Sequence, residues 1–126
     1  MRKIVVCDDG QMEMSFYKRF LPRQLPPDQY AIKYFSKAPP LTELDDAIAL
    51  FTDGSMGEGL NGGELAKAAR NRGFKGPIFL LTGEPDLYLH YQCPAGATEV
   101  FLKDNLVKIL TDCCTSIKEY AQTLPS

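Results

Sequence analysis

Ile48-Ala49-Leu50-Phe51-Thr52-Asp53-Gly54-Ser55-Met56 is the most informative stretch of this chain. Its first half is a short apolar run of the kind that forms a strand buried on both faces of a sheet. The run ends in Asp53, which is followed at once by glycine and serine. Such a strand delivers its aspartate to the carboxyl edge of the sheet, where open α/β folds bind their ligands. Taken alone, the stretch favours the simpler interpretation that Asp53 caps the following loop. Whether Asp53 instead belongs to a functional site depends on the residues that end the other strands.

The chain has 126 residues, of which 44% are hydrophobic and 24% charged, and its formal net charge is -2. These values predict a single domain over residues 1–126 with a substantial core. Two organisations stay open at this point: a single-domain protein, or one domain of a longer protein. No basic block is present, which argues against nucleic-acid binding by this domain alone. No apolar run approaches the ~20 residues that a membrane span needs. The apolar run at Ile4–Cys7 is too short for a signal peptide, and Asp8-Asp9 ends it.

The cysteines indicate a reducing environment. None of the four forms a C-x-x-C pair, and the adjacent pair near the C-terminus does not suit a disulfide framework. We therefore expect reduced thiols in a cytoplasmic protein, mostly as core residues. His90 is the single histidine, so neither a multi-histidine metal site nor a Ser-His-Asp triad within the domain is expected. The four cysteines are Cys7, Cys93, Cys113 and Cys114.

Apolar strand patterns alternate with helical patterns along the whole chain. This alternation predicts a doubly wound parallel α/β sheet with helices on both faces and right-handed crossovers. Pro22 should kink or end the first helix, Pro39-Pro40 leaves room for only a short second helix, and Pro94 cuts the fourth one short. The expected strands are residues 3–7, 31–35, 47–52, 77–81 and 99–102, and the expected helices are residues 11–25, 41–46, 64–72, 85–92 and 105–123.

Four of the five expected strands end in a chemically capable residue, and in a parallel sheet these ends share one edge. Three carboxylates gathered there repel one another, and each would resist ionising. A lysine and a hard divalent cation with oxygen ligands would offset this repulsion. Mg²⁺ fits, because it accepts one or two carboxylates together with a carbonyl and waters, and Ser55 could supply the carbonyl. The strand-end residues are Asp8 and Asp9, Asp53, Thr82 and Lys103.

A carboxylate beside Mg²⁺ and a lysine suits nucleophilic attack on a phosphoryl group. Mg²⁺ and Lys103 would neutralise charge on the transferring oxygens, and Thr82 could donate a hydrogen bond to one of them. The chain has neither a Walker A glycine loop nor a G-x-G-x-x-G motif, so no nucleotide is implied.

This ordered set resembles the receiver domain of two-component response regulators, of the CheY-like type. The resemblance runs from Ile4 to the final helix, and Ala95-Gly96-Ala97 leading to Lys103 is a further anchor. It implies a flavodoxin-like sheet with strand order 2-1-3-4-5, here with the second and fourth helices shortened. It also implies Asp53 as phospho-acceptor, Lys103 and Thr82 as phosphoryl contacts, and Asp8, Asp9, Asp53 and the Ser55 backbone carbonyl as Mg²⁺ ligands.

The resemblance implies a phospho-accepting module of a two-component phosphorelay. Its donor would be a sensor histidine kinase or a phosphotransfer protein, and it would signal by contact with a downstream protein. The only chemistry expected is self-catalysed phosphoryl transfer to Asp53 and hydrolysis of the product, so the chain would not be an enzyme in the ordinary sense. We expect a monomer or a weak dimer.

Three positions depart from the family pattern. Gly57 stands where a proline usually follows the serine and methionine, and Val100 stands where a switching Tyr or Phe is frequent. Asp104 replaces the proline that usually follows the lysine. Because a cis bond before a residue other than proline costs ~3 kcal/mol, we expect a trans Lys103–Asp104 peptide.

Two other functions compete with the receiver. The departures from the pattern motivate a receiver-like adaptor that binds partners without phosphorylation. A phosphoaspartate hydrolase also uses a strand-end aspartate, but that class usually shows Asp-x-Asp. Here the second residue after Asp53 is Ser55, so we rank the hydrolase last.

Overall fold

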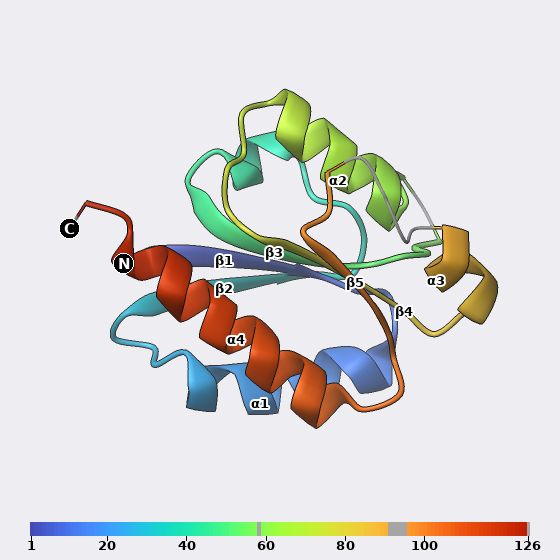
Figure 1. The fold of residues 1–126 in the computed structure, drawn as a ribbon, viewed down its shortest axis with the longest axis horizontal. Helices are drawn as coiled ribbons and strands as arrows, with labels where there is room; N and C mark the ends of the chain where they lie inside the picture. The colour runs from blue at the N-terminus through green and yellow to red at the C-terminus, as the bar shows by residue number, and fades with distance from the viewer. Residues whose placement is uncertain (58, 91–95, 126) are drawn as a thin grey trace.

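Five parallel strands form one sheet in the order β2-β1-β3-β4-β5, as expected (Figure 1). The computed structural model describes residues 1–57, 59–90 and 96–125. Helices α1 and α4 cover one face of the sheet, and η1 and α2 cover the other (Figure 1). The strands are β1 (Arg2–Cys7), β2 (Tyr30–Phe35), β3 (Ala47–Asp53), β4 (Ile78–Thr82) and β5 (Glu99–Leu102). The helices are α1 (Gln11–Gln24), the 3-10 helix η1 (Leu41–Leu44), α2 (Gly62–Asn71), α3 (Pro85–His90) and α4 (Leu106–Gln122).

The predicted fold class is therefore confirmed, including the reduction of the second helix to a single 3-10 turn. Four expectations fall on residues 91–95, outside the part of the chain that the structure describes. These are the last two residues of the fourth helix, Cys93 as a free thiol, the helix stop at Pro94, and Ala95 in the turn before β5. The Lys103–Asp104 peptide is trans, as predicted, because the described residues contain no cis peptide bond.

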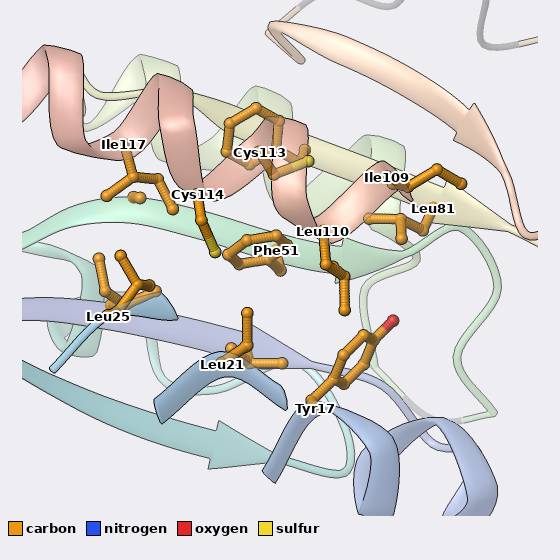
Figure 2. Packing of buried hydrophobic residues seen from close by; sticks show 14 of the residues in the cluster. Tyr17, Leu21, Leu25, Phe51, Leu81, Ile109, Leu110, Cys113, Cys114 and Ile117 are labelled. Carbon is orange, nitrogen blue, oxygen red and sulfur yellow. The ribbon is translucent and has the colours of Figure 1, made fainter. Parts of the chain in front are cut away.

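The central strands are buried on both faces, which explains their continuous apolar sequences. Alternate residues of β1 and β3 point to opposite sides: Ile4 and Phe51 pack under α1 and α4, whereas Val5 and Leu50 pack under α2. Figure 2 shows the first of these clusters, in which aromatic and aliphatic side chains fill the space between the sheet and its two helices. Burial of this apolar surface is the main stabilising contribution to the fold.

Helix α1 does not end at Pro22, contrary to one of the two outcomes expected for that proline. The helix continues to Gln24, and the Leu25 amide donates to the Leu21 carbonyl at 2.8 Å. Proline removes one backbone donor from a helix. Here Leu21 and Leu25 are both completely buried against the sheet, and their packing holds the last turn in place.

The cysteines of the described residues match the prediction of core thiols. Cys7, Cys113 and Cys114 are buried and free. Burial, followed by the charge of Asp8, raises the pKa of the Cys7 thiol to about 12. A thiol with such a pKa stays protonated at neutral pH, so Cys7 is packing rather than a nucleophile.

Helix α2 begins at Gly62, two residues before the expected start, because Asn61 caps it. The Asn61 side chain accepts from the Glu64 amide at 2.8 Å, and the Glu64 carboxylate accepts from the Asn61 amide at 3.0 Å. This capping box satisfies two backbone donors at the helix start. Gly62 itself donates to the Gly54 carbonyl at 3.2 Å, which joins the start of α2 to the end of β3.

Gly62 should be intolerant of any side chain. A Cβ atom there would lie 2.2 Å from the Asp53 carbonyl oxygen, whereas a Cβ at Gly83 meets nothing within 4 Å. We expect Gly62→Ala to lower the free energy of unfolding by about 2 kcal/mol or more, the range for overpacking a close contact. Gly83→Ala is the matched control and should be nearly neutral. Urea denaturation measures both, and equal midpoints for the two variants would contradict the prediction.

Candidate functional site

Three carboxylates meet at the carboxyl edge of the sheet, as the strand-end pattern predicted. Asp8 and Asp9 follow β1, and Asp53 is the last residue of the neighbouring strand β3. One oxygen of each lies within 4.8 Å of one oxygen of the other two. Asp8 is 1% exposed and Asp53 8% exposed, whereas Asp9 lies at the surface. The cluster is therefore open to solvent on the Asp9 side and buried on the Asp8 side.

Lys103 supplies the positive charge of the site. Lys103 follows β5, and its backbone amide donates to the Thr82 carbonyl at 2.8 Å. The backbone of Lys103 therefore lies beside the end of β4. Its ammonium nitrogen lies 2.9 Å from Asp8 Oδ2 and 3.3 Å from Asp53 Oδ1. Burial lowers the pKa of Lys103, but the hydrogen bond and charge of Asp8 and the charge of Asp53 outweigh it and raise the pKa. Lys103 is therefore protonated at neutral pH.

One lysine does not neutralise two buried carboxylates. Burial, then repulsion from Asp8, raise the pKa of Asp53 from 3.8 to about 7, even though Lys103 acts in the opposite direction. In the absence of a cation Asp53 is therefore only partly ionised near neutral pH. All the available donors are oxygens, the ligand set that Mg²⁺ prefers. The composition and charge of the cluster thus suit a divalent cation, held by Asp8, Asp9 and Asp53.

Thr82 and Ser55 lie next to this cluster. Thr82 is buried at the end of β4, and its side chain lies against Gly54, where a Cβ would be 3.3 Å from the Thr82 hydroxyl. The hydroxyl accepts from the Glu84 amide at 3.1 Å, so it caps the turn into α3, and its proton is still available to donate. The Ser55 amide makes a long 3.5 Å contact to Asp53 Oδ1. That its carbonyl binds a metal remains a prediction.

Two residues of α1 that the sequence did not predict for the site contact it: Tyr17 bonds Asp8, and Glu13 lies near Lys103. Tyr17 lies on the buried, apolar face of α1, yet its hydroxyl donates to Asp8 Oδ2 at 3.0 Å. Burial, followed by the charge of Asp8, raises the pKa of Tyr17, so the hydroxyl stays a donor. Glu13, also on α1, places a carboxylate oxygen 3.8 Å from the Lys103 ammonium. The sequence did contain one signal for Tyr17. It places a hydroxyl on the apolar face of the helix that starts shortly after Asp8-Asp9.

A third missed contact involves Gly57. Its amide donates to Asp9 Oδ2 at 3.1 Å and joins the loop after β3 to the loop after β1. The proline expected here from the family pattern would have no N–H to donate. Glycine at position 57 therefore permits a hydrogen bond between the loop after β3 and Asp9 in the loop after β1.

Comparison with solved structures identifies the fold. A receiver domain crystallised from Clostridium thermocellum superposes with a TM-score of 0.72 at 20% identity, covering 98% of this chain and 100% of that one. A CheY-like receiver domain of Methanospirillum hungatei gives 0.73 at 17% identity, with coverage of 98% and 99%. The BeF3-activated receiver domain of DrrB gives 0.70 at 20% identity, with coverage of 94% and 98%. This chain has the receiver fold. No protein-family model and no curated protein sequence matches the chain.

The receiver fold explains why distant residues converge. In the order β2-β1-β3-β4-β5, strand β3 lies at the centre of the sheet, with the Asp8-Asp9 loop on one side and Thr82 on the other. Lys103 reaches across from β5 to Asp8, a contact between residues 95 positions apart. The site is thus a product of the topology, as expected for the switch point of an open parallel sheet.

The charge of Asp53 should destabilise the metal-free protein at high pH. A carboxyl whose folded pKa of about 7 exceeds its unfolded value of 3.8 destabilises the fold fully above pH 7 and not at all below pH 4. In EDTA, Asp53→Asn should therefore raise the free energy of unfolding by roughly 2 kcal/mol at pH 8, and this gain should vanish near pH 4.

Thermal melts across this pH range measure the effect. The matched control is Asp28→Asn, which changes an exposed aspartate away from the site and should show no such pH-dependent gain. A melting temperature for Asp53→Asn equal to or below wild type at pH 8 would contradict the raised pKa.

Proposed function

We propose that this chain is a phospho-accepting receiver domain of a two-component phosphorelay, with Asp53 as the phospho-acceptor. The observation that carries the proposal is the position of Asp53 at the end of the central strand, within 3.3 Å of the Lys103 ammonium and beside Asp8 and Asp9. The receiver fold supports the same assignment, and one neighbour with that fold is described as a BeF3-activated domain.

In this proposal Asp53 attacks the phosphorus of the donor. A bond forms between an Asp53 carboxylate oxygen and phosphorus, and the bond from phosphorus to the donor histidine nitrogen breaks. Mg²⁺, held by Asp8, Asp9, Asp53 and the Ser55 carbonyl, would neutralise charge on the phosphoryl oxygens when bound. Lys103 pairs with one phosphoryl oxygen, and Thr82 donates a hydrogen bond to another. Because Asp53 must be ionised to attack, positive charge beside it favours the reactive form.

The partners follow from this chemistry. The donor is a sensor histidine kinase or a phosphotransfer protein, and the output is contact with a downstream protein. The domain works as a cytoplasmic signalling module whose only catalysis is phosphorylation and dephosphorylation of its own Asp53, as a monomer or a weak dimer. Among residues 1–57, 59–90 and 96–125, none of the helices combines the length and the apolar character needed to cross a membrane.

One observation favours the alternative of a phosphorylation-independent adaptor. The acidic residues already have donors within the chain: Lys103 and Tyr17 for Asp8, and the Gly57 amide for Asp9. A site satisfied in this way can persist as a structural feature without any phosphoryl group. The raised pKa of Asp53 argues against the adaptor. A purely structural site gains no stability from a buried carboxyl that resists ionisation.

Incubation with acetyl phosphate and Mg²⁺, followed by intact-mass measurement, tests the proposal. Wild type should gain a single phosphoryl adduct, Asp53→Asn should gain none, and Asp28→Asn should behave as wild type. An adduct that persists on Asp53→Asn would refute Asp53 as acceptor. A folded wild type that never gains one would refute the proposal and support the adaptor, and repeated turnover of a phosphomonoester would support the hydrolase.

Mg²⁺ should stabilise the fold by relieving carboxylate repulsion. At a Mg²⁺ concentration several times Kd, we expect about 1 kcal/mol of added stability, seen as a higher melting temperature than in EDTA. Asp9→Asn should abolish most of this shift, because it removes the charge of a ligand while keeping an acceptor for the Gly57 amide. Asp28→Asn should keep the full shift, and a wild type without any shift would count against a metal site.

A further inference from the structure

The buried carboxylate of Asp8 is held by three donors from three parts of the chain. The Gly10 amide donates to Oδ1 at 2.8 Å. The other oxygen, Oδ2, accepts from the Tyr17 hydroxyl at 3.0 Å and from the Lys103 ammonium at 2.9 Å. Two donors therefore share one oxygen, and that oxygen belongs to a residue that is only 1% exposed.

Tyr17 is fixed in place by the core. It is 2% exposed and packs in the cluster between the sheet and helices α1 and α4. Figure 2 shows its ring near Leu21 and Leu110, with the hydroxyl oxygen turned toward the carboxyl end of the sheet. A ring held in this way presents its hydroxyl at a set position, with little further loss of side-chain entropy.

The Lys103 ammonium contacts two carboxylates at once. Its ammonium lies closer to Asp8, at 2.9 Å, than to Asp53, at 3.3 Å. In the proposed function the same ammonium pairs with a phosphoryl oxygen carried by Asp53. A move toward that oxygen weakens the bond to Asp8 Oδ2, and a buried carboxylate oxygen left without a donor strongly opposes the move.

We propose that Tyr17 is a positioning residue of the phosphorylation site. Its hydroxyl keeps Asp8 Oδ2 hydrogen-bonded while Lys103 shifts to the phosphoryl group. The hydroxyl also holds the Asp8 carboxylate in one orientation, with Oδ1 on the Gly10 amide. This inference rests on the proposed function, and it assigns to Tyr17 a contribution to the phosphorylated state that exceeds its contribution to the unphosphorylated one.

The test is the affinity for beryllofluoride, a phosphoryl mimic, in the presence of Mg²⁺. Tyr17→Phe keeps the ring and removes only the hydroxyl. We expect it to weaken beryllofluoride binding about tenfold by isothermal titration calorimetry, the loss typical of one hydrogen bond to a charged group. Mg²⁺ affinity without beryllofluoride should change much less. Tyr30→Phe is the matched control, since Tyr30 is also buried in this cluster but lies at the opposite end of the sheet.

A purely structural role for Tyr17 would give a different result. Tyr17→Phe would then melt at a lower temperature and bind beryllofluoride as tightly as wild type, which would overturn the inference. A wild type that binds no beryllofluoride would instead refute the proposed function, and the role of Tyr17 with it. The two failures are therefore distinguishable.

A second measurement needs neither metal nor phosphoryl group. In EDTA, the loss of melting temperature caused by Tyr17→Phe should be larger in a Lys103→Met background than in wild type. The reason is that either donor alone keeps Asp8 Oδ2 hydrogen-bonded, so the full loss is seen only when both are removed. Additive losses in the two backgrounds would show that the donors do not share this task and would overturn the proposal.

Discussion

A single ammonium group facing two buried carboxylates is the constraint on which this site depends. Lys103 lies within 3.3 Å of both Asp8 and Asp53, and its charge makes their burial tolerable. It does not balance them, because the pKa of Asp53 still rises to about 7. The remaining negative charge is of the sign that suits a bound cation, and in the proposed function a cation beside Asp53 would favour its ionised, nucleophilic form.

The rest of the fold holds these charges at fixed distances. Strands β1 and β3 are buried on both faces, so their ends cannot shift without disturbing two packed layers. Glycine permits the closest approaches: Gly62 lies against the Asp53 carbonyl, and Gly54 lies against Thr82. Packing of the core thus fixes where β1 and β3 end and so where Asp8 and Asp53 lie.

The sequence predicted those features that depend on strand ends, and it missed those that depend on side-chain direction. Asp53, Thr82 and Lys103 were found because parallel strands must finish at one edge. Tyr17 was missed because an apolar helix pattern does not reveal where a hydroxyl points. The Asn61 cap could have been found from Asn-Gly-Gly-Glu. The extent of α1 was expected from its apolar pattern, but whether Pro22 would kink or end that helix depends on core packing that no local rule contains.

The departure at Gly57 has a physical meaning that the sequence alone did not reveal. Its amide ties the loop after β3 to Asp9, the one exposed carboxylate of the cluster. In the proposed function Asp9 is a Mg²⁺ ligand, so the loop after β3 is bonded directly to a residue of the metal site. Val100, short and stiff at χ1, sits half-buried opposite Leu80 and has no ring to swing. Of these two departures from the family pattern, Gly57 therefore contacts the acidic site directly, whereas Val100 offers no aromatic side chain to β5.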